Sequence, residues 1–436
     1  MYSSKLANVN IPNQESNFHQ SQFGRQDRKL SFVVVGAGLI GPRHASHIVS
    51  RHDCELFAIV DHSLNGPSVA QTFNTKLFKQ LPDLFEFCHR NNVKFPDAAI
   101  IATPNHTHLQ IGMQLAKNGI HILMEKPLAP SAIECKTLIE YCYSKQVALL
   151  VGHHRRFNPY ITAAKNSLFK LGKIIAVQGS WTLCKPQSYF LEKPWRSSKQ
   201  KGGGTLLINL IHDLDLLQFL MGPIEKVYAE LLMKQRSATD NDEDMLTYDD
   251  LVDEGAVLTL KFANGCCGTF VCADNVTSPF LFEAGTGENP TIPFNDSISG
   301  FYRIFGSSGT LSLPDMKLYH QFTENESSWL KPISTCDIPL DYREANHDLF
   351  GMISPSPSPD TKFEFNEKPK PFDLQLDHFI NIINGDESIV KCTGEDALQA
   401  LLCIDAVMKS IDTGLPQYVE RVESVQPDLD LLATFG

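Results

Sequence analysis

An apolar run followed by a glycine-rich turn constrains the fold of this chain more than any other feature. Residues 29–35 are mostly apolar, Gly36-Ala-Gly-Leu-Ile-Gly41 follows them, and residues 42–52 are compatible with a helix. A second apolar run at residues 56–60 ends on Asp61. Strand, turn, helix and strand in this order predict the first unit of a doubly wound parallel sheet.

The turn and the acid after it together predict a dinucleotide site. Gly36 permits the sharp turn, Gly38 lets a pyrophosphate approach the backbone, and Gly41 lets helix and strand pack closely. The helix N-terminus offers unpaired N–H groups to phosphates. A glycine turn without a ligand is the alternative, but it does not explain the ordered elements around it. We expect cofactor contacts from Gly36, Gly38, Leu39, Ile40 and Gly41.

The type of dinucleotide is indicated by Asp61. It lies about 20 residues after the third glycine, where a carboxylate accepts hydrogen bonds from the ribose hydroxyls of NAD. The same charge repels a 2′-phosphate. The sequence therefore predicts NAD rather than NADP.

Length and composition set the broad class of the protein. The 436 residues are too many for one ordinary core, and 42% hydrophobic with 20% charged residues is typical of a soluble globular protein. A net charge of −12 gives no reason to expect nucleic acid, and no apolar window is long enough for a membrane helix. Eleven scattered cysteines indicate reduced thiols, so we expect a cytoplasmic location.

Strand-like and helix-like segments alternate until about residue 151, and β-rich runs such as 256–273 and 301–313 follow. We therefore expect an α/β protein with an N-terminal Rossmann sheet and a C-terminal α/β domain built on a large, mostly antiparallel open sheet. The predicted segments are a disordered polar tail (1–28), a dinucleotide-binding domain (29–151), a substrate and oligomerisation domain (152–420) with loops at 236–254 and 352–371, and a second tail (421–436).

Two further strand ends bring polar residues to the edge where the dinucleotide binds. The run at 98–102 leads into Thr103-Pro-Asn-His-Thr-His108, and the run at 120–124 ends in Glu125-Lys-Pro127. Ligands of such sheets bind outside the carboxyl ends of the strands. Lys126 would there stabilise the alkoxide-like oxygen of a hydride transfer, the alternative being a solvated surface charge.

Residues 205–221 predict a buried helix, because apolar side chains cover most of its circumference. Asn209, His212 and Asp215 interrupt this pattern every three residues, which places them in one stripe. Buried polar groups need partners, and His212 could accept the proton that an alcohol loses as its hydride leaves. The alternative is a satisfied, purely structural histidine. The pairs His106/His108 and His153/His154 lack the spacing of metal ligands, so we expect no metal.

A series of ordered motifs resembles the glucose-fructose oxidoreductase, inositol dehydrogenase and rhizopine-catabolism (Gfo/Idh/MocA) family over residues 30–415. The motifs are the glycine turn, Ala102-Thr-Pro-Asn-His-Thr-His108, Glu125-Lys-Pro127, Arg156-Phe-Asn-Pro159, Pro194-Trp-Arg196, Gly202-Gly-Gly204 and His212-Asp-Leu-Asp215. The resemblance implies reversible oxidation of a hydroxyl on a sugar, polyol or related ring compound, and a homo-oligomer, dimer or tetramer.

The resemblance also implies roles for single residues. Thr103, Asn105, His108 and Glu125 are expected to contact the cofactor in addition to the glycines and Asp61. Lys126 and His212 are the expected catalytic residues and face the substrate, together with Arg156 and Asn209.

One position departs from the family pattern. Many members carry an aspartate four residues before the catalytic histidine, and here that position is Ile208, with Asn209 one residue later. Asn209 can orient an imidazole but cannot stabilise imidazolium as a carboxylate would, whereas Asp215 could. This departure keeps a non-enzymatic NAD(P) sensor or regulator open as a second hypothesis. Such a sensor has no chemical need for Glu125-Lys-Pro127 or His212, so an enzyme is favoured.

Overall fold

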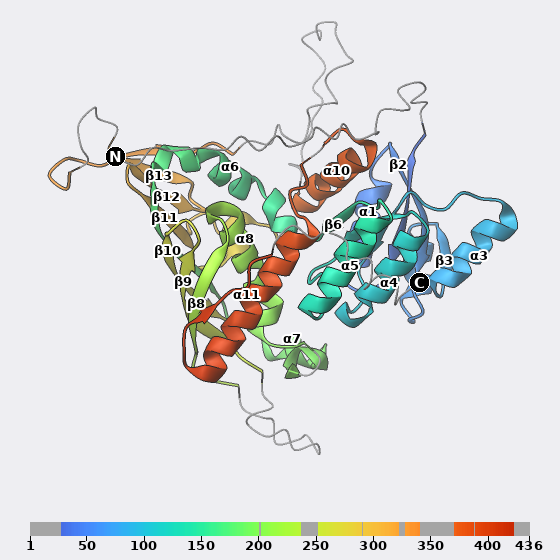
Figure 1. The fold of residues 1–436 in the computed structure, drawn as a ribbon, viewed down its shortest axis with the longest axis horizontal. Helices are drawn as coiled ribbons and strands as arrows, with labels where there is room; N and C mark the ends of the chain where they lie inside the picture. The colour runs from blue at the N-terminus through green and yellow to red at the C-terminus, as the bar shows by residue number, and fades with distance from the viewer. Residues whose placement is uncertain are drawn as a thin grey trace, which may run out of the picture.

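The computed structural model describes residues 28–199, 202–236, 252–289, 291–321, 328–340, 370–387 and 389–422. Within them the chain forms two sheets, one six-stranded and one nine-stranded, each covered by helices (Figure 1). The predicted fold class is confirmed. The predicted tails and most of the loops at 236–254 and 352–371 lie outside the described residues.

The first sheet is wholly parallel, with strand order β3-β2-β1-β4-β5-β6. Helices cover both of its faces, so its central strands are apolar throughout; Phe32, Val33 and Val34 are all inaccessible to solvent. The strands are β1 (Leu30–Val35), β2 (Cys54–Val60), β3 (Lys76–Phe78), β4 (Ala98–Ile101), β5 (His121–Met124) and β6 (Leu149–Val151). The helical segments are α1 (Gly41–Val49), α2 (Gly66–Thr72), α3 (Leu81–Asn91), η1 (Asn105–Thr107), α4 (His108–Lys117) and α5 (Ala132–Ser144).

The order of these strands fixes where a ligand binds. The chain proceeds outward from β1 to β2 and β3, and then returns to the other side of β1 with β4. The loops after β1 and β4 therefore separate, which leaves the binding position typical of doubly wound sheets beside them. Asp61 and Glu125 follow β2 and β5 at the same edge, which we call the carboxyl edge.

The second sheet has strand order β14-β13-β12-β11-β7-β10-β9-β8-β15 and is antiparallel except for the pair β7 and β10. Its strands are β7 (Ile174–Thr182), β8 (Ile224–Leu231), β9 (Gly255–Phe262), β10 (Cys267–Ala273), β11 (Tyr302–Gly306), β12 (Gly309–Leu313), β13 (Lys317–His320), β14 (Ser334–Asp337) and β15 (Gln417–Tyr418). The helical segments of this half are η2 (His154–Phe157), α6 (Pro159–Ser167), η3 (Leu168–Leu171), α7 (Gln187–Leu191), η4 (Pro194–Ser197), η6 (Leu206–Leu210), α8 (Ile211–Met221), α9 (Phe282–Thr286), α10 (Pro371–Asn384) and α11 (Gly394–Thr413).

Helices of the described residues cover one face of the second sheet. Figure 1 shows α6, α8 and α11 on one side of the strands. Buried and exposed side chains alternate along β9 and β10, as expected for a sheet covered on one face. Large apolar side chains are partly exposed on these and other strands of the sheet, among them Val257, Val271, Phe305 and Tyr319.

The two halves meet through the last two helices. α10 packs against α1 of the first half and η2 of the second, and α11 packs against α5, α8 and β8. Two side-chain pairs connect α10 to this region: Asp373 binds His47 of α1, and Asp377 binds Arg51, which follows α1. These contacts hold α10 against the last turn of α1, while η2 of the second half packs on the same helix.

The predicted helix at 205–221 differs from an ordinary α-helix in its first part. Residues Leu206–Leu210 form a π-helical turn, and only Ile211–Met221 are α-helical. The wider turn changes the angular spacing of side chains, so the predicted stripe of one residue in three does not extend back to Asn209. Among the described helices, none has both the length and the apolar character that crossing a membrane requires.

Candidate active site

The glycine turn fits a dinucleotide. Gly36 has φ +107°, and a Cβ there would lie 2.5 Å from the carbonyl oxygen of Ala102. A Cβ at Gly41 would overlap the carbonyl oxygen of Gly36. At Gly38 a Cβ would meet nothing within 4 Å, so the backbone there is open on one side. The first and third glycines are therefore required by the fold, and the second is free for the approach of a phosphate.

The start of α1 and Asp61 complete the fit. No side chain caps the N-terminus of α1, which leaves its first N–H groups for an anion. Asp61 accepts hydrogen bonds from the N–H groups of Ala37 (2.5 Å) and Ser63 (2.6 Å). Burial alone would raise the pKa of Asp61, but the hydrogen bonds from Ser63 and Ala37 outweigh it and hold the pKa below its usual value. The carboxylate keeps lone pairs for ribose hydroxyls.

This geometry predicts opposite outcomes for two glycine substitutions. Gly38→Ala should fold with a free energy of unfolding within about 1 kcal/mol of wild type, yet weaken NAD binding about tenfold or more, because the methyl group occupies the phosphate approach. Gly41→Ala should unfold the first half, because its methyl group overlaps backbone. Thermal unfolding and NAD titration separate the two. Normal NAD affinity in Gly38→Ala would contradict this placement of the pyrophosphate.

Lys126 lies at the end of β5 and reaches the second half of the molecule. Its Nζ donates a hydrogen bond to the carbonyl oxygen of Ile208 at 3.2 Å. The neighbouring Glu125 is held by His44 of α1, with 2.8 Å between Nε2 and Oε1. Ile208 stands where the family pattern has an aspartate. The lysine is therefore bound there by a main-chain oxygen of the π-helical turn instead of by a carboxylate.

Burial and neighbouring charges lower the pKa of Lys126. Burial lowers the pKa of Lys126 to about 8; Glu125 opposes this, whereas the cations of Arg155 and Lys185 add to it. A lysine of this kind is charged at neutral pH but holds its proton less tightly than a solvated lysine. Such a cation can stabilise a developing alkoxide.

His212 occupies the first turn of α8, with its residue only 7% exposed. Its Nδ1 has no hydrogen-bond partner among the described residues. Burial, followed by the nearby cations of Lys126 and Arg155, puts the pKa of His212 well below 6.5. The imidazole is therefore neutral at physiological pH and has a lone pair that can accept a proton.

The other two residues of the predicted stripe have different partners. The side-chain oxygen of Asn209 accepts a hydrogen bond from Nζ of Lys185 at 2.8 Å. Asp215 binds Arg156, with 2.6 Å between Oδ1 and Nη2. It lies 3.6 Å from Nδ1 of His153. The interpretation that Asp215 supports His212 directly is therefore replaced by an ion pair with Arg156.

Two predicted ligand contacts lie inside the protein. Arg156 is 4% exposed and is held by Asp215, by Asp396 and by the carbonyl oxygen of Lys391. His108 is fully buried, and its ring nitrogens face the carbonyl oxygens of Thr103, Pro127 and Leu128 at 3.0–3.3 Å. Both residues are thus held by protein groups, and their expected contacts with substrate and cofactor stay predictions.

The remaining predicted cofactor contacts lie at the carboxyl edge. Thr103 follows β4, and its hydroxyl bonds that of Thr107 at 2.7 Å. Asn105 begins η1 and is half-buried. Leu39 is 78% exposed on the glycine turn, and Ile40 is the residue before α1.

Sequence reasoning missed three residues near this site. Lys185 follows β7 and also binds Asp274 at 3.1 Å. Glu288 follows α9 and binds His154, with 3.0 Å between Oε1 and Nε2. His44 lies three residues after the last glycine and binds Glu125. Only His44 had a local signal, a histidine in the first turn of a phosphate-facing helix. No group of three or more His, Cys, Asp or Glu side chains is arranged to hold a metal ion within the described ranges.

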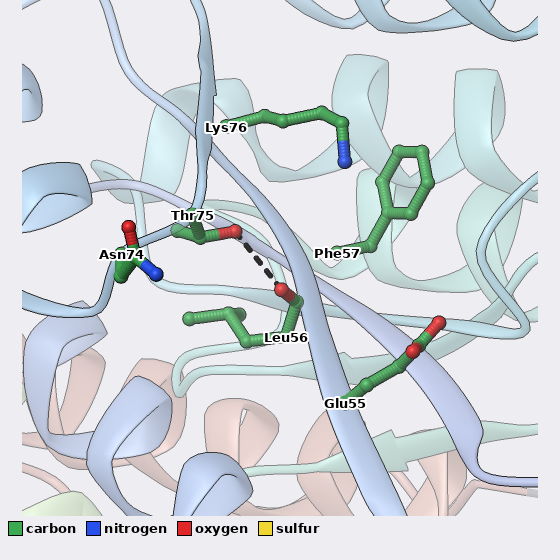
Figure 2. Close-up of a pocket in the computed structure, with 6 residues that line it drawn as sticks. All are labelled: Glu55, Leu56, Phe57, Asn74, Thr75 and Lys76. Carbon is green, nitrogen blue, oxygen red and sulfur yellow. Dashed lines mark hydrogen bonds between the residues drawn. The ribbon is translucent and has the colours of Figure 1, made fainter.

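A pocket elsewhere in the first half does not compete with this site. Figure 2 shows it beside β2 and β3, lined by Glu55, Leu56, Phe57, Asn74, Thr75 and Lys76. The hydroxyl of Thr75 donates to the carbonyl oxygen of Leu56 at 2.9 Å, and the Lys76 ammonium lies 4.8 Å from the centre of the Phe57 ring. These residues belong to the amino ends of the two strands, opposite Asp61. Ligands of doubly wound sheets bind at the other end.

Known proteins resemble this chain in sequence and in fold. A 2,7-anhydro-N-acetylneuraminate hydratase of Mediterraneibacter gnavus is 26% identical over 227 residues, which are 50% of this chain and 57% of that protein. A levoglucosan dehydrogenase of Pseudarthrobacter phenanthrenivorans is 28% identical over 271 residues, 57% of this chain and 68% of the relative. The chain thus spans between half and about two thirds of the length of these relatives.

Solved structures share the whole architecture. A WlbA dehydrogenase from Bordetella pertussis, in complex with NADH and UDP-GlcNAcA, superposes with a TM-score of 0.64 at 22% identity, covering 91% of this chain and 100% of that one. Residues 30–153 match the family model "Oxidoreductase family, NAD-binding Rossmann fold", and residues 169–420 match "Oxidoreductase family, C-terminal alpha/beta domain". Both halves are matched, and the chain belongs to the Gfo/Idh/MocA family of oxidoreductases.

Proposed function

We propose that this protein is an NAD-dependent oxidoreductase that transfers a hydride between the nicotinamide and a hydroxyl-bearing carbon of a sugar, polyol or cyclic diol. One observation carries the proposal: Lys126, at the carboxyl edge, binds the turn that leads directly into His212. A cation and a neutral imidazole are thereby brought to the end of the sheet where the dinucleotide fits. Relatives named as levoglucosan and inositol dehydrogenases support the substrate class.

Each residue has a defined part in this proposal. When bound, NAD supplies the acceptor of the hydride. Lys126 holds positive charge beside the substrate oxygen, and His212 accepts the hydroxyl proton on its Nε2 atom. Asn209, fixed by Lys185, has its side-chain oxygen occupied and its amide hydrogens available to a substrate.

The preference for NAD is proposed to rest on the charge of Asp61. Asp61→Asn removes the charge that repels a 2′-phosphate and keeps an acceptor for one of the two N–H groups, because Ala37 and Ser63 donate to different carboxylate oxygens. The dissociation constant for NADP should fall about tenfold or more, while that for NAD changes less. Fluorescence titration with both reduced cofactors measures the ratio. An unchanged ratio would place discrimination elsewhere.

The proposed activity is tested by measuring nicotinamide reduction with a panel of sugars, inositols and cyclic diols. We expect reduction with at least one member. Tight binding of NAD(H) without reduction of cofactor by any member would favour the sensor. We further propose a homo-oligomer that uses the face of the second sheet bearing Val257, Val271, Phe305 and Tyr319, since exposed apolar side chains on one face favour burial against another surface.

A further inference from the structure

A second histidine beside His212 has the carboxylate partner that His212 lacks. His154 begins η2 just after β6, and its Nε2 lies 3.0 Å from Oε1 of Glu288. A carboxylate only accepts, so the Nε2 atom of a neutral His154 carries the hydrogen and Nδ1 carries the lone pair. Glu288 stays ionised: burial would raise its pKa, but the charge of Arg155 and the hydrogen bonds from His154 and Asn158 lower it.

The free nitrogen of His154 faces neither solvent nor a described partner. Its Nδ1 and the Nδ1 of His212 are both buried, and neither has a hydrogen-bond partner among the described residues. The two rings lie 5.8 Å apart between centroids and are inclined by 73°. Phe372 stacks on the opposite side of His154 at 4.4 Å and limits the positions of the ring. Two unpartnered buried nitrogens on neighbouring imidazoles can satisfy each other.

His153 offers a competing connection, which the geometry favours less. Its ring lies 6.2 Å from that of His212, and its Nδ1 lies 3.6 Å from Oδ2 of Asp215. That separation is too long for a hydrogen bond, and Asp215 already binds Arg156. His154 and Glu288 lie within hydrogen-bond distance at 3.0 Å, so His154 is the better supported of the two connections.

We propose that His154 and Glu288 are positioning residues that act through His212 and replace the carboxylate missing at Ile208. As the substrate hydroxyl gives its proton to Nε2 of His212, His212 passes the proton of its Nδ1 to Nδ1 of His154. Glu288 stabilises the resulting imidazolium, as an aspartate does when it is hydrogen-bonded to a catalytic histidine. Catalytic hydrogen bonds of this kind often tighten only when substrate binds.

The charged groups around His154 are compatible with this relay. Glu288 lies on one side, with Arg155 and Asn158 also bound to its carboxylate. Glu125, from the loop after β5, is bound by His44 instead. His212 approaches from α8, with 5.8 Å between the two ring centroids. Glu288 is therefore the carboxylate that stabilises the imidazole when it becomes charged.

The relay rests on the proposed function and predicts a specific pattern of kinetics. Glu288→Gln should lower kcat about 10- to 100-fold, with the dissociation constant for NAD unchanged. His154→Gln should have a similar effect, and the double variant should be no slower than the slower single variant, because both changes interrupt one chain. The pH at which kcat falls on the acid side should also shift in Glu288→Gln. If Glu288→Gln fails to fold, His154→Gln still tests the relay, because Glu288 then remains bound by Arg155 and Asn158.

The matched control is a second histidine–carboxylate pair, His378 of α10 with Glu387, which follows that helix; their Nδ1 and Oε2 atoms lie 2.6 Å apart. Glu387→Gln removes an equivalent hydrogen-bonded carboxylate away from the site and should leave kcat within about twofold of wild type. Additive losses in the double variant, or an equal loss from His153→Gln, would overturn the relay.

A readout without turnover separates the relay from the proposed function. In protein labelled with ¹⁵N-histidine and saturated with NADH, the relay predicts a slowly exchanging Nδ1 proton on His212. This signal should vanish in His154→Gln and persist in Glu387→Gln. If the wild type reduces no cofactor with any panel member, the proposed function fails, while this signal still decides the relay. A signal unaffected by His154→Gln would refute it.

Discussion

Replacing Lys126 with methionine should lower kcat by about 10²–10³-fold, while the dissociation constant for NAD stays within about threefold of wild type. Methionine keeps an apolar chain of similar length but removes the ammonium group that binds Ile208 and would face the substrate oxygen. The loss should fall on kcat, because the charge develops on the substrate mainly in the transition state. Steady-state kinetics and cofactor titration measure the two quantities.

The matched control for this substitution is Lys165. Its ammonium also donates to a main-chain carbonyl oxygen, that of Phe219, but on the outer side of α6. Lys165→Met should change kcat less than threefold. Retained turnover in Lys126→Met, within tenfold of wild type, would remove Lys126 from the proposed chemistry.

The pH dependence gives a second readout for the same residue. Burial lowers the pKa of Lys126 to about 8, so the ammonium is present below that pH and is lost as the pH rises through it. The contribution of Lys126 to kcat should decline above about pH 8. Lys126→Arg keeps its charge at higher pH. Any activity that it retains should lack this decline.

Asp215→Asn should lower the free energy of unfolding by about 3–5 kcal/mol, because it leaves the guanidinium of Arg156 buried without its main counter-ion. Asp215 and Arg156 are 1% and 4% exposed, so water cannot replace the lost partner. Asparagine has the same shape, which limits the change to charge and hydrogen bonding. Denaturant unfolding followed by circular dichroism measures the effect.

A surface pair provides the comparison for Asp215→Asn. Glu86 and Arg90 form an ion pair along one face of α3, and both side chains are more than half exposed. Glu86→Gln should cost less than about 1 kcal/mol. A loss of similar size in Asp215→Asn, accompanied by a raised KM, would restore Arg156 to the substrate site and contradict its packing role.

The parts of the fold that the sequence predicted are those determined by neighbours in the chain. The glycine turn and Asp61 belong to one short segment, so their spacing alone indicates the strand, the turn and the acid. The start of α5 was likewise predictable, because Ser131 accepts a hydrogen bond from the N–H of Glu134 only three residues away. Alternating strands and helices then predicted the parallel sheet.

The site was less predictable because its partners come from distant segments. The pattern at 205–221 predicted an α-helix, since no residue type marks a π-helical turn, and Asn209 was therefore assigned to the wrong stripe. The family resemblance implied a substrate contact for Arg156, and its ion pair with Asp215, 59 residues away, left no local signal. Glu288 and Lys185 lie in loops whose positions depend on the packing of the second sheet.

The account is tested most directly by following an isotope. The protein is incubated with NADH that carries deuterium at C4 of the nicotinamide and with a pool of keto-sugars and ketoinositols, and the products are examined by mass spectrometry. We predict deuterium on a carbinol carbon of one product with wild type, and incorporation about 100-fold slower or more with Lys126→Met at equal cofactor occupancy. Tight cofactor binding by wild type with no deuterium in any product would contradict hydride transfer to this substrate class.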